Sequence, residues 1–334
     1  MCRNCRMIPF GLVLAGLVLL VSPSVQSMDK LISIRPVHTY SIVCYDSLTG
    51  ELGAAVQSHW FKVSDVIWVE PGVGAVATQS LAEFSYGPLG LEMLKIGKSP
   101  QGALDGLLRS DENFEVRQVA IIDARGNSAV HTGDLCIAEA GHRQVPGYCV
   151  QANLMEKSTV WNAMGEAFEK TEGDLADRMM AALEAAQAEG GDIRGKQSAA
   201  MLVVKAESTG RPWDDRTVDI RVDDSSEPLV ELRRLLNITR SYAWMNKGDE
   251  LIADSLFDQA AEAYAKAATL APGNVEILFW HAATLVTVGE IDRALPILAE
   301  CFAKDEAWRE LIPRLVKSEL LPDDKAIIDR ILQQ

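Results

Sequence analysis

Residues 39–57 read TYSIVCYDSLTGELGAAVQ, and this stretch decides the fold expected for the first part of the chain. Its apolar segments 40–44 and 52–57 are typical of buried β-strands. Between them, Asp46 and Gly50 supply the side chain and the backbone freedom that a tight hairpin connection needs. The stretch therefore predicts two antiparallel strands at the beginning of a sheet domain.

Outward from this hairpin, short strands alternate with paired helices up to about residue 224. We predict further strands at 73–78, 116–123, 128–132, 148–153, 199–205 and 217–222, and helices at 87–96, from 100 onward, at 160–170 and at 175–188. Antiparallel strands interrupted by helix pairs favour two packed sheets with the helices outside them. Residues 39–224 are therefore expected to form an α+β domain.

The first residues have the organisation of an export signal. Arg3 and Arg6 precede an uncharged apolar run at 8–21, and small polar residues follow up to Ser27. This order is typical of a signal peptide that is cleaved after Ser27, and the apolar run is short for a membrane span. We expect a signal peptide at 1–27, a pro-segment or linker at 28–38, and a periplasmic or secreted protein that leaves the membrane after cleavage. The alternative is an uncleaved anchor.

Charge and cysteine content limit the partners of the chain. The formal net charge is −15, which argues against binding to nucleic acid or to an anionic membrane. Cys136 and Cys149 are close in sequence, so one disulfide in an oxidising compartment and two buried thiols both remain open. The spacing of the histidines matches no zinc-binding pattern, and the sequence indicates neither a metal nor a cofactor.

From residue 227 onward, only helix is predicted, with a repeat period of 34 residues. Its apolar and small residues are Trp244, Gly248, Leu251, Ala260, Tyr264, Ala267 and Pro272, followed in register by Leu278, Ala282, Leu285, Ala294, Leu298 and Cys301. This spacing predicts an all-α array at 227–334 similar to tetratricopeptide repeats. Two repeats make a thin solenoid, so we expect the array to lean on the sheet domain or on a second copy of the chain. It would either dock a protein partner or serve as a stabilising appendage.

Several motifs along 39–224 share a resemblance to one family. They are Thr39–Val43, Gly74–Gln79, Tyr86–Pro88, Arg117–Val119, His131–Gly133, Gln151–Asn153, Gly190–Ala200 and Asp219–Asp224. As a set they resemble DUF1028, a family of unassigned function. The resemblance implies the four-layer αββα sandwich of the N-terminal-nucleophile (Ntn) hydrolases. It implies no established reaction.

An Ntn hydrolase uses the side chain of its first residue as the nucleophile and the free α-amine of that residue as the base. The amine has a pKa near 8, so part of it is unprotonated at neutral pH. Thr39 matches the nucleophile position of the family. The bond between His38 and Thr39 would have to be cut for this chemistry. If the bond stays intact, Thr39 is only the first residue of a strand, where threonine is common.

The glycine-rich loop 190–198 supplies the remaining catalytic candidates. By analogy with Ntn hydrolases, Asp192 would orient the Thr39 amine and Ser198 would relay a hydrogen bond. Arg194 or Lys196 would bind a substrate carboxylate or stabilise an oxyanion. The alternative is a tight turn between helix and strand that carries a solvated charge cluster.

Two strand ends add substrate-binding candidates. Ser58, His59 and Lys62 follow the second strand, and Thr78 and Gln79 end the third. They would line the pocket or donate to an oxyanion; the alternatives are a solvated strand end and an ordinary turn. Two functions are therefore expected. One is an exported hydrolase of a small amide, a peptide or a peptidoglycan fragment. The other is a non-catalytic binding or scaffold protein with an inactive Ntn-like core.

Overall fold

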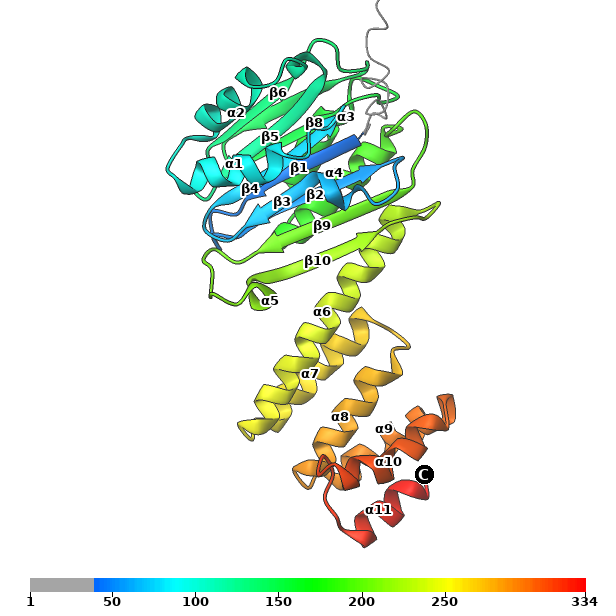
Figure 1. The fold of residues 1–334 in the computed structure, drawn as a ribbon. Helices are drawn as coiled ribbons and strands as arrows, with labels where there is room; N and C mark the ends of the chain where they lie inside the picture. The colour runs from blue at the N-terminus through cyan, green and yellow to red at the C-terminus, as the bar shows by residue number, and fades with distance from the viewer. Residues whose placement is uncertain (1–38) are drawn as a thin grey trace, which may run out of the picture. The chain divides into compact units, whose positions relative to one another are not determined.

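The structure is a computed structural model that describes residues 39–334 (Figure 1). The predicted signal peptide at 1–27 and the pro-segment at 28–38 lie outside the described residues. Within the described range, no helix has the combination of length and apolar character that crossing a membrane requires.

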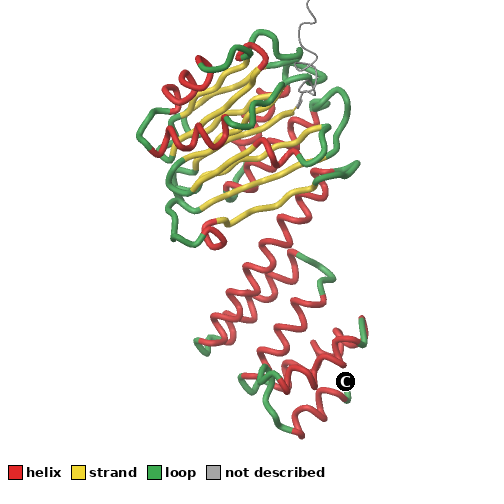
Figure 2. The backbone as a smooth tube through the Cα atoms, viewed as in Figure 1, coloured by secondary structure: helices red, strands yellow, loops and turns green. Residues whose placement is uncertain are grey.

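Ten strands in the described chain form two antiparallel sheets, drawn in yellow in Figure 2. The six-stranded sheet has the order β10-β9-β2-β1-β8-β7. Its strands are β1 (Thr39–Tyr45), β2 (Leu52–Ser58), β7 (Gly141–Val145), β8 (Tyr148–Ala152), β9 (Ser198–Val204) and β10 (Arg216–Val222). The four-stranded sheet has the order β3-β4-β5-β6 and consists of β3 (Ile67–Glu70), β4 (Gly74–Ser80), β5 (Arg117–Asp123) and β6 (Ser128–Thr132).

The hairpin between β1 and β2 forms where the sequence predicts it. The Asp46 carboxylate accepts the N–H groups of Leu48 at 2.8 Å and Thr49 at 3.4 Å. Gly50 has a φ of 76°, a backbone conformation that glycine adopts without steric cost. The aspartate and the glycine thus perform the two roles that their residue types predict for a tight connection.

Helices cover the outer face of each sheet. They are α1 (Tyr86–Lys95) and α2 (Pro100–Arg109) on the four-stranded sheet, and α3 (Val160–Lys170) and α4 (Leu175–Ala188) on the six-stranded sheet. Ser99 and Asp174 cap α2 and α4, because their side chains accept backbone N–H groups at 3.1 and 2.9 Å. Figure 1 shows α1 and α2 in front of β4, β5 and β6.

A third apolar cluster lies between the two sheets. It includes Val43, Leu52 and Val56 from the six-stranded sheet, and Ala75 and Ile122 from the four-stranded sheet. Because side chains alternate along a strand, β1, β2, β8 and β9 send one set of residues to α3 and α4 and the other set between the sheets. The chain is therefore α+β, with antiparallel sheets followed by helices, as predicted.

The structure adds two short strands that the sequence pattern did not predict. β7 has the sequence GHRQV and alternates between half-buried and exposed residues, because it is an edge strand that pairs only with β8. β3 has four residues, which is too short for a clear alternation. Both strands extend sheets whose central members carry the apolar signal.

The cysteines of the described chain are free thiols. Cys149 is buried between the sheets. Cys136 lies in the loop after β6, where its thiol donates to the carbonyl of Arg117 at 3.3 Å. Of the two alternatives for this pair, the structure therefore has separate thiols instead of a disulfide. Burial raises the pKa of Cys149 to about 12, which keeps this thiol protonated at neutral pH.

After β10, the chain is helical to its end. The helices are α6 (Pro228–Ala253), α7 (Phe257–Leu270), α8 (Val275–Thr287), α9 (Ile291–Lys304), α10 (Ala307–Lys317) and α11 (Lys325–Leu332), and the short helix α5 (Pro212–Asp215) precedes β10. α6 begins with a proline at the predicted boundary. Its residues Leu229, Leu232 and Leu236 belong to the apolar cluster of the six-stranded sheet. Farther along, a Cβ on Gly248 would lie 2.6 Å from the Tyr264 ring, so glycine allows α6 and α7 to approach closely.

Candidate functional site

A row of buried hydroxyl groups lies at the end of the six-stranded sheet where β1 begins. Thr39 is the register partner of Ser58, and Ser58 is the register partner of Ser198. All three residues are fully buried. On the other side of β1, the N–H of Asn153 donates to the carbonyl oxygen of Thr39 at 3.1 Å. The structure thus brings three of the predicted site residues together in one row.

Buried carboxamides hold the backbone of Thr39 from the facing sheet. The Nε2 atom of Gln79 donates to the Thr39 carbonyl at 3.0 Å and to Oε1 of Gln118 at 2.7 Å. Oε1 of Gln79 accepts from the Ser41 hydroxyl at 2.7 Å, and Nδ2 of Asn153 donates to Gln118 at 2.9 Å. Every side chain of this network is fully buried. Two donors from different elements therefore fix the Thr39 carbonyl.

The network continues beyond these contacts. Gln151 donates to the Ser41 hydroxyl at 3.2 Å, and Gln118 donates to the Thr132 hydroxyl at 2.9 Å. Gln79 is among the site residues that the sequence predicts, whereas Ser41, Gln118, Gln151 and Asn153 are not. A signal was available, because Thr39 and Ser41, and likewise Gln151 and Asn153, are polar residues two apart on otherwise apolar strands. Such pairs share one face of a strand.

Asp192 is buried and bound on several sides. Its carboxylate accepts hydrogen bonds from Nη2 of Arg194 at 2.7 Å and from Nε at 3.0 Å. Two hydrogen bonds fix the orientation of the guanidinium, which a single ion pair would not. The carboxylate also accepts the N–H groups of Arg194 at 2.9 Å and of His59 at 3.2 Å. Asp192 thereby ties the loop before β9 to the end of β2, one residue from Ser58. Its orientation of a Thr39 amine stays a prediction.

The Ser198 hydroxyl holds the chain that follows β2. It donates to the carbonyl of Trp60 and accepts the N–H of Val63 at 3.1 Å. Close by, Nδ1 of His59 is buried and has no hydrogen-bond partner among the described residues. Ser198 therefore positions the loop in which His59 lies, and its catalytic relay stays a prediction.

Three of the predicted site residues point elsewhere. Lys62 forms an ion pair with Asp65 at 3.0 Å, and Lys196 forms one with Glu227. Thr78 is buried on β4, but strand alternation turns its side chain toward the helix-covered face of the sheet, away from Gln79. The described contacts do not bring these three side chains to Thr39, and their roles in substrate binding stay predictions.

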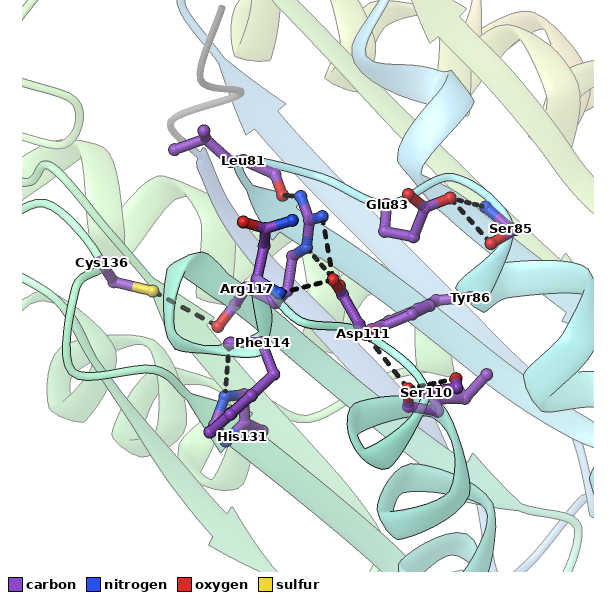
Figure 3. Close-up of polar contacts among 12 residues, drawn as sticks. Leu81, Glu83, Ser85, Tyr86, Ser110, Asp111, Phe114, Arg117, His131 and Cys136 are labelled. Carbon is purple, nitrogen blue, oxygen red and sulfur yellow. Dashed lines mark hydrogen bonds and ion pairs between the residues drawn. The ribbon is translucent and has the colours of Figure 1, made fainter. Parts of the chain in front are cut away.

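A partly buried ion pair supports the loops next to Gln79 (Figure 3). Nε of Arg117 lies 2.7 Å from Asp111, which also accepts the Tyr86 hydroxyl at 2.9 Å, and Arg117 donates to the carbonyl of Leu81. Burial by itself raises the pKa of Asp111, but hydrogen bonds from Arg117 and other donors outweigh burial and lower it. Ser80, the register partner of Arg117, has a φ of 69°, which is rare for a residue with a side chain. The ion pair therefore stabilises a strained strand end beside the row.

A separate hollow of about 510 Å³ lies along β3, β9 and β10, with Trp68, Leu202 and Arg221 among its lining residues. None of its lining residues belongs to the row of Thr39, Ser58 and Ser198. Buried polar groups from both sheets converge on Thr39, whereas the hollow lies at the sheet edges. We therefore place the candidate site at Thr39.

The comparisons with known proteins match the sheet domain that contains the candidate site. A family model described as a family of unknown function (DUF1028) matches residues 39–232, which include the whole row and its network. The chain belongs to the DUF1028 family. The crystal structure of the DUF1028 protein SPO2555 from Silicibacter pomeroyi is similar, with a TM-score of 0.54 and 30% sequence identity over 60% of this chain and 84% of that chain. No curated protein matches the chain. The DUF1028 match ends inside α6, so α7 to α11 lie beyond it.

Proposed function

We propose that this DUF1028 protein is an exported amide hydrolase of the Ntn type, with Thr39 as its nucleophile after the preceding residues are removed. One observation carries the proposal: a threonine begins the central strand β1, and buried donors from both sheets hold its carbonyl. An N-terminal nucleophile needs a backbone whose position is fixed, because its own amine must act on its own hydroxyl.

The reaction uses the hydroxyl group and the free α-amine of Thr39. Oγ1 of Thr39 attacks the amide carbonyl carbon, and the free α-amine of Thr39 takes the hydroxyl proton. The C–N bond of the substrate breaks, and the leaving amine receives that proton. Water then attacks the resulting ester with the same amine as the base, which releases the acid and restores the hydroxyl.

Arg194 is the proposed donor to the oxyanion. The Asp192 carboxylate accepts both the guanidinium of Arg194 and the N–H of His59. Because His59 directly follows Ser58, this carboxylate holds the guanidinium close to the row. The Arg194 side chain is 30% exposed, so a substrate at this end can approach the guanidinium. A cation aimed at the developing negative charge stabilises the transition state more than the ground state. The substrate would be a small amide, a peptide or a peptidoglycan fragment.

A non-catalytic binding protein is the second candidate. Thr39 is fully buried, so its hydroxyl is not open to a substrate in the described structure. The helices favour a docking role, because Ala260, Ala267, Ala282 and Ala294 are buried at the predicted repeat positions. Small buried residues at these positions support tetratricopeptide-like packing, which in this reading presents a surface to a protein partner.

The first test is the N-terminus of the protein recovered from its host, read by intact mass and N-terminal sequencing. The hydrolase predicts a chain that begins at Thr39, because only then is the amine free. A chain that begins at Met28 favours the binding protein.

The second test uses a β-lactone, an electrophile that acylates nucleophilic hydroxyl groups. We expect the adduct on the Thr39 peptide in the wild type and in Thr39→Ser, and its loss in Thr39→Ala. Thr78→Ala is the matched control, since this threonine is also buried but lies on the other face of its sheet. Labelling that persists in Thr39→Ala removes this residue from the mechanism.

A further inference from the structure

An apolar strip begins one residue after Asn153, which is the backbone partner of the proposed nucleophile Thr39. It consists of Ile137, Leu154 and Ile193, which lie on three adjacent loop backbones. The N–H of Leu154 donates to the carbonyl of Ile137 at 3.0 Å, and the N–H of Ile193 donates to the carbonyl of Leu154 at 3.2 Å. Leu154 follows Asn153, whose N–H holds the Thr39 carbonyl. The strip is therefore built onto the same hydrogen bonds as the site.

Two of the three side chains of the strip are exposed although they are apolar, and Leu154 is half-buried. Ile193 is 63% exposed and Ile137 is 39% exposed, and Leu154 has a φ of 56°, which a residue with a branched side chain rarely adopts. Phe61 and Leu135 are also more than half exposed, on other loops at this end of the sheets. Contiguous exposed apolar side chains on a folded protein commonly mark a binding surface.

The charges around the strip are negative. In the loops at this end, the basic residues are already in ion pairs: Lys62 with Asp65, Lys157 with Glu189, Arg194 with Asp192 and Lys196 with Glu227. Acidic residues of these loops that form no ion pair within the described chain are Glu83, Glu112, Glu115, Asp134, Glu139, Glu156 and Asp224. At the opposite end, Lys98 and Arg125 form no ion pair among residues 39–334, so unpaired basic residues stand there beside unpaired acidic residues such as Glu172 and Glu207. The net field at the Thr39 end therefore favours a cation.

Two of the acidic residues without an ion pair, Glu139 and Glu156, are joined to the strip through the backbone. The carbonyl of Glu139 accepts the N–H of Met155 at 3.1 Å, and the N–H of Glu156 donates to Gly191 at 2.9 Å. These bonds continue the backbone ladder of Ile137, Leu154 and Ile193 by one step. A ligand on the strip would therefore lie close to the two acidic residues Glu139 and Glu156.

We propose that the Thr39 end binds cationic hydrophobic peptides, with apolar side chains on the strip and lysine or arginine side chains facing Glu139 and Glu156. This inference rests on the proposed function and names its substrate class, since the bound peptide supplies the amide that Thr39 attacks. Electrostatic complementarity selects the peptide, and the apolar contacts retain it.

Binding is tested on the full-length Thr39→Ala protein by fluorescence anisotropy, so that turnover cannot change the probe. The probe is a short labelled peptide that alternates lysine and leucine. We expect about tenfold weaker binding when glutamate replaces lysine, and a similar loss when serine replaces leucine. Affinity for the lysine peptide should fall as salt is added, because exposed charges are screened.

Substitutions locate the surface. Ile193→Ser should weaken binding about tenfold, whereas Leu48→Ser, on a residue that is 94% exposed at the opposite end, should leave it unchanged. Glu139→Gln combined with Glu156→Gln should remove most of the salt dependence, and Glu172→Gln with Glu207→Gln is the matched control. Circular dichroism checks that each variant folds. Equal binding of lysine and glutamate peptides, no binding, or equal effects of Ile193→Ser and Leu48→Ser would overturn the inference.

The two proposals fail separately. If the β-lactone labels Thr39 but the lysine peptide does not bind, the substrate class is wrong and the hydrolase stands. If the peptide binds to the strip but Thr39 is neither freed nor labelled, the hydrolase is wrong and the surface is a peptide-binding site alone.

Discussion

The Thr39 end of the layer between the sheets and the helical C-terminal region have interiors of opposite character. Near Thr39, the sheets bury carboxamides, among them Gln79 and Gln118, which bond to one another. The helices bury apolar side chains such as Phe279 and Leu298 beside small alanines. A buried amide costs free energy unless it is paired, so an apolar layer would stabilise the sheets at least as well. The buried carboxamides therefore fix the position of the groups around Thr39 more than they stabilise the fold.

The largest effect should come from the apolar interior. Phe279→Ala removes a fully buried ring that packs against Trp308, with a centroid distance of 4.7 Å. We expect a loss of about 3–5 kcal/mol in the free energy of unfolding, because the cavity adds to the lost burial. Urea denaturation followed by circular dichroism measures it. A loss below about 1 kcal/mol would mean that the helical core is loosely packed.

A smaller loss is expected in the polar layer. Gln118→Leu leaves the donors of Gln79 and Asn153 without their acceptor, at about 2–4 kcal/mol for the two together. Adding Gln79→Leu removes one orphaned donor, so the double variant should lose less than the sum of the two singles. Exposed Gln144→Leu is the control, with a change near 0.5 kcal/mol at most. Strict additivity would contradict a coupled network.

The smallest expected effect is on the pH dependence of stability, through a largely buried histidine in the helical region. His281 stacks on Tyr264 with ring centroids 4.0 Å apart, and burial, with Arg293 nearby, lowers the pKa of His281 to about 4. The unfolded chain binds a proton below pH 6.5 and the folded chain does not, so this stability is present above pH 6.5 and is lost as the pH falls toward 4.

Unfolding measured at pH 7.5 and 4.5 should show about 2 kcal/mol of this loss in the wild type. His281→Phe keeps an aromatic ring on Tyr264 and should lose correspondingly less. Equal pH dependence in both proteins would assign the acid sensitivity to other groups.

The sequence predicted the central elements well, because their signals are local. The hairpin of β1 and β2 needed only apolar runs, Asp46 and Gly50, and α3 and α4 begin and end where the apolar spacing places them. The edge strand β7 was missed, since His142 and Gln144 are exposed there and give it no apolar face. Edge strands are defined by their partners, which a local pattern does not contain.

The site was predictable in part. Thr39, Ser58 and Ser198 lie at strand ends that meet at one edge of the sheet, and the side chain of Gln79 donates to the Thr39 carbonyl. Gln118 and Asn153 were missed because their part in the site depends on cross-sheet contacts between residues far apart in the chain. Lys62 and Thr78 lie near the site in sequence, but an ion pair and the strand pleat turn them away.

The hydrogen bonds to the Thr39 carbonyl have a consequence for the proposed cleavage before Thr39. The contacts from Gln79 and Asn153, and the pairing of β1 with β2 and β8, all fall on the carboxyl side of the bond between His38 and Thr39. Cutting that bond removes none of them, so the strand that carries the new terminus stays in place. Activation in this protein would be a change of one chemical group on an unmoved scaffold.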